Sequence, residues 1–239
     1  LEGFVVEQSN WAITTSGEGV RFDGLHLLDS SYGIVVWSGS GVITGCEFAR
    51  NYNDGLNINT TTGTWRVEGC TVTGNHRGLV CGGGNTEIVG NVLSANTSYG
   101  LGVPIHGQVL VADNVCTDSV QFLAVGIGNG GQLEVRNNVF ASASDFSCVT
   151  RWGDETTVSF INNTFYAAGH LLFSCIPNGF PTSTVIVRNN IFYGAGGGTV
   201  QLGSATDPAD GLNLTSDYNN WFGSFTCETY MQAGQTSYA

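Results

Sequence analysis

Residues 132–140 read QLEVRNNVF, residues 157–165 read TVSFINNTF and residues 184–192 read TVIVRNNIF. These stretches share one pattern: an apolar residue, any residue, Gly or Asn, an anchor residue, any residue and a second apolar residue. The anchor recurs every 21 to 27 residues, at Phe4, Leu25, Cys46, Cys70, Asn91, Asn114, Asn138, Asn163, Asn190 and Asp217. Such steady spacing identifies a repeat protein, in which each repeat forms one structural unit.

Each repeat has the alternation of β-strands. Leu133, Val135 and Phe140 are expected to point inward, with the charged residues between them pointing out. A second short strand follows eight or nine residues after the anchor and is often opened by a glycine, such as Gly33 or Gly78. One coil cannot bury its apolar face alone, so the coils must stack. The sequence therefore predicts an all-β fold, a parallel β-helix (solenoid) of about ten coils that forms a single domain over residues 1–239.

Anchors of successive coils should lie about 4.8 Å apart, which is the spacing of neighbouring strands. The five anchors from Asn91 to Asn190 are predicted to form an asparagine ladder, in which each buried amide donates to one coil and accepts from the other. Cys46 and Cys70 hold the same position in adjacent coils, within the Cα separation of a disulfide. Their side chains would run parallel, so we expect free stacked thiols.

These NNxF turns and the coil length resemble the repeat of the pectate-lyase-like superfamily of parallel β-helix proteins, over nearly the whole chain. The resemblance implies a right-handed coil, as does the general handedness of parallel connections. It implies no single activity, because polysaccharide lyases, glycoside hydrolases, uronate epimerases, phage tailspikes and surface adhesins all resemble one another in this fold. A carbohydrate-interacting protein, secreted or at the cell surface, is the expectation.

The charge of the chain limits the classes of partner that are expected. All seven cationic residues are arginines, and the formal net charge is -12. Phosphates would be repelled, so nucleic acid is not an expected partner. No apolar stretch of about 18 residues exists, so no membrane-spanning helix is expected. Outward charges on the strands should form weak ion pairs between coils, such as Arg66 with Glu87.

Both ends of the repeat are expected to be uncapped. Leu1 already falls on a strand of the first coil, and the last copy decays after Asp217. Open strand edges invite pairing with other strands. The sequence therefore predicts that another chain pairs with the N-terminal coil, as in a homo-oligomer, or that missing sequence covers it.

The turns that follow the anchor strands carry the predicted catalytic residues. His76 and Arg77 lie in the stretch GNHRG, Arg50 lies one coil earlier and Tyr99 one coil later. A uronate lyase needs a cation that neutralises the sugar carboxylate and a base that removes the neighbouring proton. Arg together with His or Tyr can supply both functions. The alternative is that these polar residues only serve the turns.

The same side of the solenoid carries the predicted substrate-binding residues. Tyr52, Trp11 and Tyr32 could stack on sugar faces, and Asp54 is the fourth member of the set. A glycosidase would need two carboxylates roughly 5–10 Å apart, and only Asp54 is well placed here. Aromatic residues that cover a solvent edge are the alternative.

The stretch RWGDE is a second candidate site. Arg151 and Trp152 could bind carbohydrate, while Asp154 and Glu155 could hold Ca²⁺. A solvated loop explains the same four residues. No cofactor is required by these patterns, and calcium is the one ion for which they offer ligands.

The leading hypothesis is a β-helix that interacts with an acidic or neutral polysaccharide, acting as a uronate polysaccharide lyase if it is catalytic. The rival is a non-catalytic structural or adhesive module, or a fragment of a larger surface protein. The two differ in geometry: convergence of His76, Arg77 and Asp54 in a groove favours an enzyme, whereas their separation on a convex edge favours the structural module.

Overall fold

A computed structural model of the chain describes residues 1–60, 63–81, 84–104, 107–119, 121–125, 131–152, 155–177, 183–202 and 213–229. Within these residues every regular element is a β-strand, and the strands form three parallel sheets. Neighbouring strands in a sheet come from successive coils. The all-β parallel solenoid and its right-handed coil are therefore confirmed.

Sheet A holds the strands that lead into the anchors: β3 (Val20–Asp23), β6 (Gly41–Thr44), β9 (Thr64–Glu68), β12 (Asn85–Val89), β15 (Gln108–Ala112), β18 (Gln132–Arg136), β21 (Thr157–Ile161), β24 (Thr184–Arg188) and β27 (Asn213–Asp217). Sheet B holds the strands that follow the anchors: β1 (Val5–Glu7), β4 (His26–Leu28), β7 (Glu47–Ala49), β10 (Thr71–Thr73), β13 (Val92–Ser94), β16 (Val115–Thr117), β19 (Val139–Ser142), β22 (Thr164–Ala167), β25 (Ile191–Gly194) and β28 (Asn220–Phe222).

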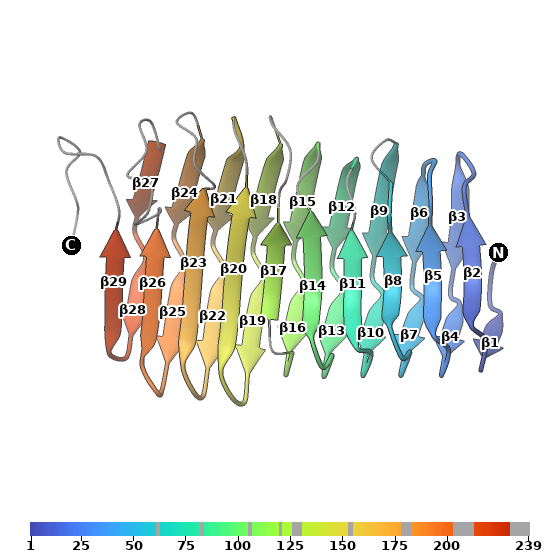
Figure 1. The fold of residues 1–239 in the computed structure, drawn as a ribbon, viewed down its shortest axis with the longest axis horizontal. Coiled ribbons are helices and arrows are strands. Elements are labelled where there is room, and N and C mark those ends of the chain that lie inside the picture. Colours follow the sequence, from blue (N-terminus) through green and yellow to red (C-terminus); the bar gives the residue numbers. More distant parts are fainter. Residues whose placement is uncertain are drawn as a thin grey trace.

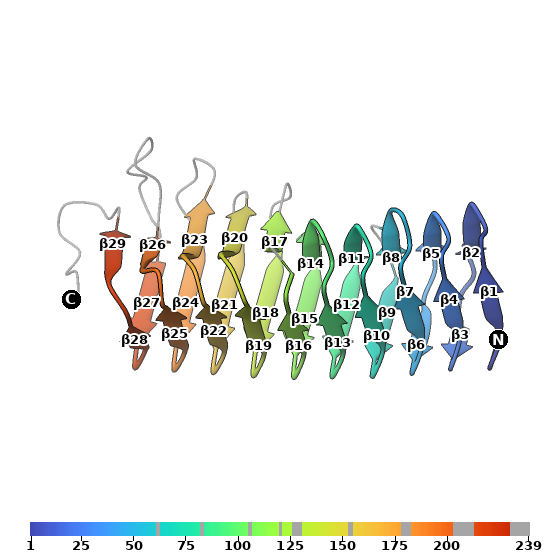
Figure 2. The same ribbon diagram turned by 90° about the horizontal axis from the view of Figure 1, so that it is seen from below.

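Sheet C holds the third strand of each coil: β2 (Trp11–Thr15), β5 (Tyr32–Val36), β8 (Asp54–Ile58), β11 (Arg77–Cys81), β14 (Tyr99–Pro104), β17 (Gln121–Val125), β20 (Phe146–Trp152), β23 (Leu171–Pro177), β26 (Gly198–Leu202) and β29 (Phe225–Thr229). Figure 1 shows sheet C in front of the other two sheets, and Figure 2 shows the same stack of coils from below. The three outer faces are the surfaces on which a ligand could lie.

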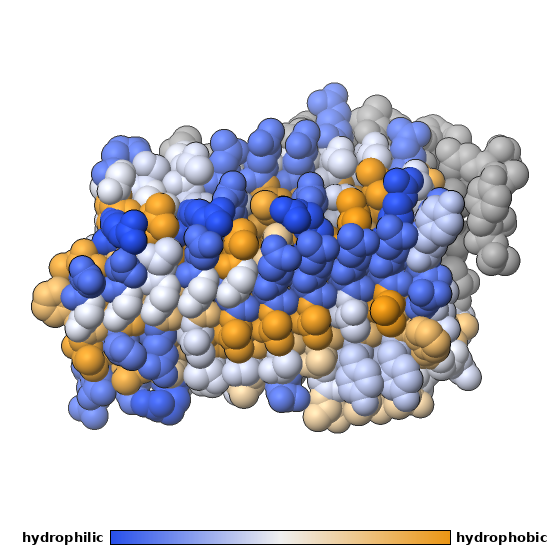
Figure 3. All heavy atoms as spheres, turned by 180° about the vertical axis from the view of Figure 1, so that it is seen from behind, coloured by the Kyte–Doolittle hydropathy of each residue, from blue (hydrophilic) through white to orange (hydrophobic). Residues whose placement is uncertain are grey.

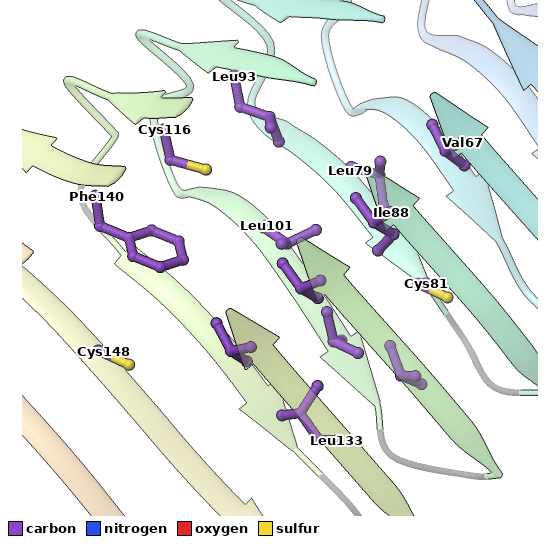
Figure 4. Close-up of a cluster of buried hydrophobic side chains, with 14 of the residues drawn as sticks. Val67, Leu79, Cys81, Ile88, Leu93, Leu101, Cys116, Leu133, Phe140 and Cys148 are labelled. Carbon is purple, nitrogen blue, oxygen red and sulfur yellow. The ribbon is translucent and has the colours of Figure 1, made fainter. Parts of the chain in front are cut away.

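Side-chain alternation fills the interior as predicted. Leu133, Val135 and Phe140 are buried, while Glu134 between them is exposed. Figure 4 shows how such residues from successive coils meet in the interior. Aromatic side chains fill the interior of the later coils, where the ring of Phe165 stacks on that of Phe140 at 5.1 Å between centroids. Side chains of the same kind thus pack on one another at equivalent positions of neighbouring coils.

The asparagine ladder is present at the predicted anchors. Asn138 Oδ1 accepts both the backbone N–H and Nδ2 of Asn114 at 2.9 Å. The Nδ2 of Asn138 donates in turn to Asn163 Oδ1 at 3.0 Å and to the Val111 carbonyl at 2.9 Å. Each buried amide is therefore satisfied by its own and the neighbouring coils, as burial requires.

The predicted last anchor, Asp217, is wrong. Asn190 donates from its backbone and from Nδ2 to Asn219 Oδ1, at 2.9 and 3.0 Å. A left-handed residue precedes each ladder asparagine, and Tyr218 (φ 54°) takes that role ahead of Asn219 as Asn189 (φ 55°) does ahead of Asn190. The last coil is two residues longer than the pattern assumed, which places Asp217 at the end of β27.

A second asparagine ladder was not predicted. Asn51 Nδ2 donates to Asn75 Oδ1 at 2.9 Å, and Asn75 Nδ2 donates to Asn96 Oδ1 at 3.1 Å. Ser30 and Ser119 continue it on either side through hydrogen bonds with Asn51 and Asn96. This ladder fixes the turn between sheets B and C in five successive coils, and therefore the place where β5, β8, β11, β14 and β17 begin.

Cys46 and Cys70 are free and buried, which confirms the prediction of unbridged thiols at these two positions. Burial raises the pKa of Cys116 and of Cys175 to about 12. The thiolate is the reactive form of cysteine. These two sulfurs therefore act as core atoms.

Candidate functional site

The first residues of five successive sheet C strands form one line on the outside of the solenoid, called here the sheet C row. Trp11 pairs in register with Tyr32, and Arg77 pairs with Asp54 on one side and Tyr99 on the other. Ile34 of β5 pairs with Leu56 of β8, and the same register, continued toward the start of both strands, aligns Tyr32 with Asp54. The row brings together five of the residues that the sequence indicated.

Glycines determine which way the side chains of the sheet C row point. The second residue of β11 is Gly78, where a Cβ would overlap the carbonyl oxygen of Gly100 in the next coil and the amide of Asn96. No side chain fits at that inward position. The strands therefore begin one residue ahead of the predicted glycines, and the residue in front of each glycine turns outward. Tyr99 shows this turn, because its ring lies over the outer face of the strand at Gly102.

Asp54 is the centre of the row and is completely buried. Arg77 Nη2 donates to Asp54 Oδ2 at 2.8 Å, and Arg77 Nε donates to Oδ1. Asn57 Nδ2 also donates to Oδ2, at 2.6 Å. Bidentate Arg–carboxylate pairs of this kind are among the stronger hydrogen-bonded contacts in proteins. The carboxylate therefore has partners for both oxygens without water.

Arg77 joins this buried pair to Tyr99. Its side chain is one-third exposed, and Nη1 donates to the Tyr99 hydroxyl at 3.4 Å. The guanidinium carbon lies 6.0 Å from the centre of the Tyr99 ring, within cation–π distance. Burial lowers the pKa of Arg77, but the hydrogen bonds and charge of Asp54 outweigh it, so this pKa is raised. Arg77 is thus a fixed cation with one side toward solvent.

An aromatic platform occupies the N-terminal end of the row. Trp11 lies 5.3 Å from Tyr32 and 5.6 Å from Trp37, measured between ring centroids, and it is stacked on Trp37. Trp11 is 41% exposed and Trp37 46% exposed. Trp37 was not among the predicted site residues. It follows β5 directly and has the opposite parity to the core residues Ile34 and Val36, which is the signal that could have found it.

Arg50 and Tyr52 lie on the turn that leads into β8. Arg50 donates from Nε and Nη2 to the two oxygens of Asp29, at 2.8 and 2.6 Å. This hydrogen bonding lowers the pKa of Asp29 from its usual value. Tyr52 is 81% exposed. Both line a depression of about 540 Å³ whose other walls include Asn10 and Ser31, the residues just before the platform.

The predicted catalytic residues do not form one group. Arg77 and Tyr99 are in contact. Arg50 is held by Asp29. His76 is exposed, and its Nδ1 lies 3.2 Å from Thr97 Oγ1 in the following coil. Arg77 binds Asp54 in the preceding coil and Tyr99 in the following one, so the side chains of His76 and Arg77 have different partners.

The second predicted site is only partly described. Arg151 and Trp152 lie at the end of β20, but their side chains fall outside the described part of the structure, as does all of Asp154. Glu155 is exposed and has a φ of 52°. Among the residues whose positions are given, no group of three His, Cys, Asp or Glu side chains could hold a metal ion. That part of the chain also has no helix that could span a membrane.

The described side chains of the platform and the Asp54–Arg77 pair offer groups that can contact a ligand. Two indole rings and a phenol offer flat apolar faces, and the Asp54–Arg77 pair beside them offers directed donors. Both arginines of the predicted catalytic group are engaged by aspartates through two nitrogens each. Neither Arg50 nor Arg77 is therefore left as an unpaired cation that could neutralise a uronate carboxylate.

Comparison with known proteins bears on the fold. The sequence model described as "Right handed beta helix region" matches residues 3–165 and, in an overlapping second match, residues 54–221. No curated protein and no solved structure matched the chain. Since the matched residues make up most of the sequence and the coil and sheet pattern agree with them, the chain belongs to the right-handed β-helix family.

Proposed function

We propose that this protein binds an extended, neutral polysaccharide on the outer face of sheet C. The observation that carries this proposal is the pair of exposed, mutually stacked indoles of Trp11 and Trp37, next to the Asp54–Arg77 pair. Aromatic faces with a few directed polar groups are the usual composition of ligand sites. A location outside the cell or at its surface goes with this function, because extended polysaccharides occur there.

The charge of the site favours a neutral ligand over an acidic one. Arg50 and Arg77 are each neutralised by an aspartate. The chain as a whole has a formal net charge of -12, which repels polyanions. A sugar hydroxyl can accept from the exposed side of Arg77 and donate to the Tyr99 oxygen without disturbing the ion pair. Neutral chains therefore meet matched groups along the row.

The row gives such a ligand a direction. Strands of one sheet are about 4.8 Å apart, so five coils offer a line of contacts about 20 Å long. The line runs along the axis of the solenoid, from Trp11 past the Asp54–Arg77 pair to Tyr99. A linear polymer, extended along this axis, would contact all of it. A single sugar would contact only one part.

A uronate lyase is the second candidate function, and the contact between Arg77 and Tyr99 favours it. A tyrosine hydroxyl beside a fixed cation is an arrangement that can take part in proton transfer. In an elimination the Tyr99 oxygen, as the phenolate, would take the proton from the carbon next to the uronate carboxylate. A C=C bond would form as the neighbouring C–O glycosidic bond breaks, and the departing oxygen would take up a proton, leaving an unsaturated sugar. That product absorbs in the ultraviolet, so incubation with pectate and alginate, followed spectroscopically, tests this activity directly.

The platform is tested by replacing both of its indoles. The Trp11→Ala/Trp37→Ala variant is expected to bind neutral polysaccharide at least about 30-fold more weakly, since aromatic anchors often contribute about 2 kcal/mol or more. Affinity electrophoresis in gels that contain soluble starch, galactomannan or hydroxyethyl cellulose provides the measurement, with pectate and alginate as acidic counterparts.

Tyr166→Ala is the matched control, because Tyr166 is 41% exposed but belongs to sheet B. It should migrate as the wild type does. Retardation of the wild-type protein by neutral gels alone supports the proposal. Equal retardation of the wild type and the double indole variant would refute it, and so would retardation by the acidic gels only.

A further inference from the structure

The outer face of sheet A holds a second candidate site, apart from the sheet C row. A trough of about 430 Å³ crosses β9, β12, β15, β18 and β21 there. Figure 3, which views the molecule from behind, shows mostly hydrophilic residues with apolar ones among them on this side. The trough shares no residue with the platform or with the Asp54–Arg77 pair.

One side of the trough is a row of uncharged hydrogen-bonding side chains, called here the amide row. Thr64 pairs in register with Asn85, and Gln132 pairs with Gln108 and Thr157 on its two sides. Asn85 Oδ1 accepts the backbone N–H of Gln108 at 3.2 Å, which joins the two halves. Asn85, Gln108 and Gln132 are all exposed. Amide donors and acceptors thus recur at the strand spacing of about 4.8 Å.

The trough has one apolar side chain on its floor, and the charged groups around it form ion pairs. Leu110 is half-buried and lies between Glu87 and Glu134 of the adjacent strands. Arg66 forms the predicted ion pair with Glu87 and also binds Glu68 at 2.9 Å, and Arg136 binds Glu134 at 2.9 Å. All five charged side chains are partly exposed, so these pairs are weak and accessible. A ligand here meets the side chain of Leu110 between ion pairs in which carboxylates outnumber guanidinium groups.

We infer that this trough binds a second neutral polysaccharide chain, through hydrogen bonds from the amide row and apolar contact with Leu110. Amides both donate and accept, so they suit a ligand whose hydroxyl groups do the same. The charged groups around the trough are ion-paired with one carboxylate in excess, which disfavours an anionic polymer. The amide row repeats over consecutive coils, so a polymer with regularly spaced hydroxyls would meet the same groups at each step. This site lies beyond the proposed function and does not depend on it.

The experiment separates the two sites by variants of the full chain. Leu110→Arg fills the trough with a side chain that the flanking Glu87 and Glu134 can accommodate, so folding is retained. Val92→Arg is its control, because Val92 is 45% exposed on sheet B, outside both sites. Each change is also made in the Trp11→Ala/Trp37→Ala background. Isothermal titration with soluble starch, galactomannan and hydroxyethyl cellulose measures binding, and circular dichroism checks the fold.

The double indole variant is expected to retain binding to at least one of these polymers. Adding Leu110→Arg should weaken that residual binding about tenfold or more, the result of losing one or two hydrogen bonds and the apolar contact. Adding Val92→Arg should leave it unchanged. The trough is refuted if the double indole variant binds none of the three polymers, or if Leu110→Arg leaves its binding unchanged.

The outcomes also distinguish the two sites from each other. Complete loss of binding in the double indole variant would leave the proposed function intact and remove only the trough. Wild-type affinity in the double indole variant, together with loss in Leu110→Arg, would support the trough and remove the sheet C site.

Discussion

Replacing Asn138 with leucine is expected to lower the free energy of unfolding by about 3 kcal/mol. Leucine has a similar size but leaves the Asn114 backbone N–H and the Val111 carbonyl without their partner, and both groups are in the interior. Each buried polar group left unsatisfied costs about 1–3 kcal/mol, and the added apolar contact offsets part of this. Urea unfolding followed by circular dichroism measures the change.

Asn220→Leu is the control for this prediction, because Asn220 lies in a sheet B strand but is exposed. Its effect should stay within about 0.5 kcal/mol, as for most surface changes. Hydrogen exchange adds a local reading, since the Asn114 amide should lose protection in Asn138→Leu. Equal stability of the two variants would mean that the ladder does not hold the coils together.

Replacing Arg77 with methionine should lower the free energy of unfolding by about 3 kcal/mol. The substitution keeps much of the apolar stem but leaves the fully buried carboxylate of Asp54 without its counter-ion. Removing one partner of a buried ion pair costs about 3–5 kcal/mol, and the exposed side of Arg77 places the expected loss at the lower end. Thermal and urea unfolding provide the measurement.

Arg50→Met makes the same change in an ion pair whose aspartate is exposed. Its cost should be below about 1 kcal/mol, as for surface pairs. A further variant tests the cause: Asp54→Asn in the Arg77→Met background removes the unpaired charge and should restore part of the stability. A cost for Arg77→Met no larger than that for Arg50→Met would show that Asp54 is not dependent on Arg77.

The fold could be predicted because its determinants are local and repeated. The pattern around Asn138 recurs with the same inward residues, and a repeated pattern can only be satisfied by stacking. The error at Asp217 has the same origin, since the last coil keeps the left-handed residue and the asparagine but shifts them by two positions. Spacing alone cannot show such a shift when the flanking apolar residues have also changed.

The second ladder was within reach of the sequence. Asn51, Asn75 and Asn96 each follow an anchor by five residues, and Ser30 and Ser119 hold the same place in the coils on either side. The sequence does not single them out, because polar residues in turns have an ordinary explanation as turn formers. Periodicity between coils, rather than residue type within one coil, is what separates a ladder from a turn.

The sequence indicates which residues belong to the candidate site better than it indicates their contacts. The sequence indicates that Arg77, Asp54 and Tyr99 share one side, because the coil spacing aligns them. It does not show that Asp54 takes two nitrogens of Arg77, or that His76 turns toward Thr97. Those facts depend on which way adjacent residues leave the turn, and the inward glycine at Gly78 decides that direction.

Oxidative footprinting of the tryptophans tests whether a polysaccharide binds on sheet C, because it reports where the glycan lies. The wild-type protein is oxidised with and without a neutral polysaccharide that retards it, and each tryptophan is read by mass spectrometry. Trp11 and Trp37 are exposed on sheet C, while Trp221 is 38% exposed on sheet B and serves as the internal reference. Bound polysaccharide is expected to protect Trp11 and Trp37 from oxidation and to leave the oxidation of Trp221 unchanged. Unchanged oxidation of both sheet C indoles in the presence of bound polysaccharide would contradict it.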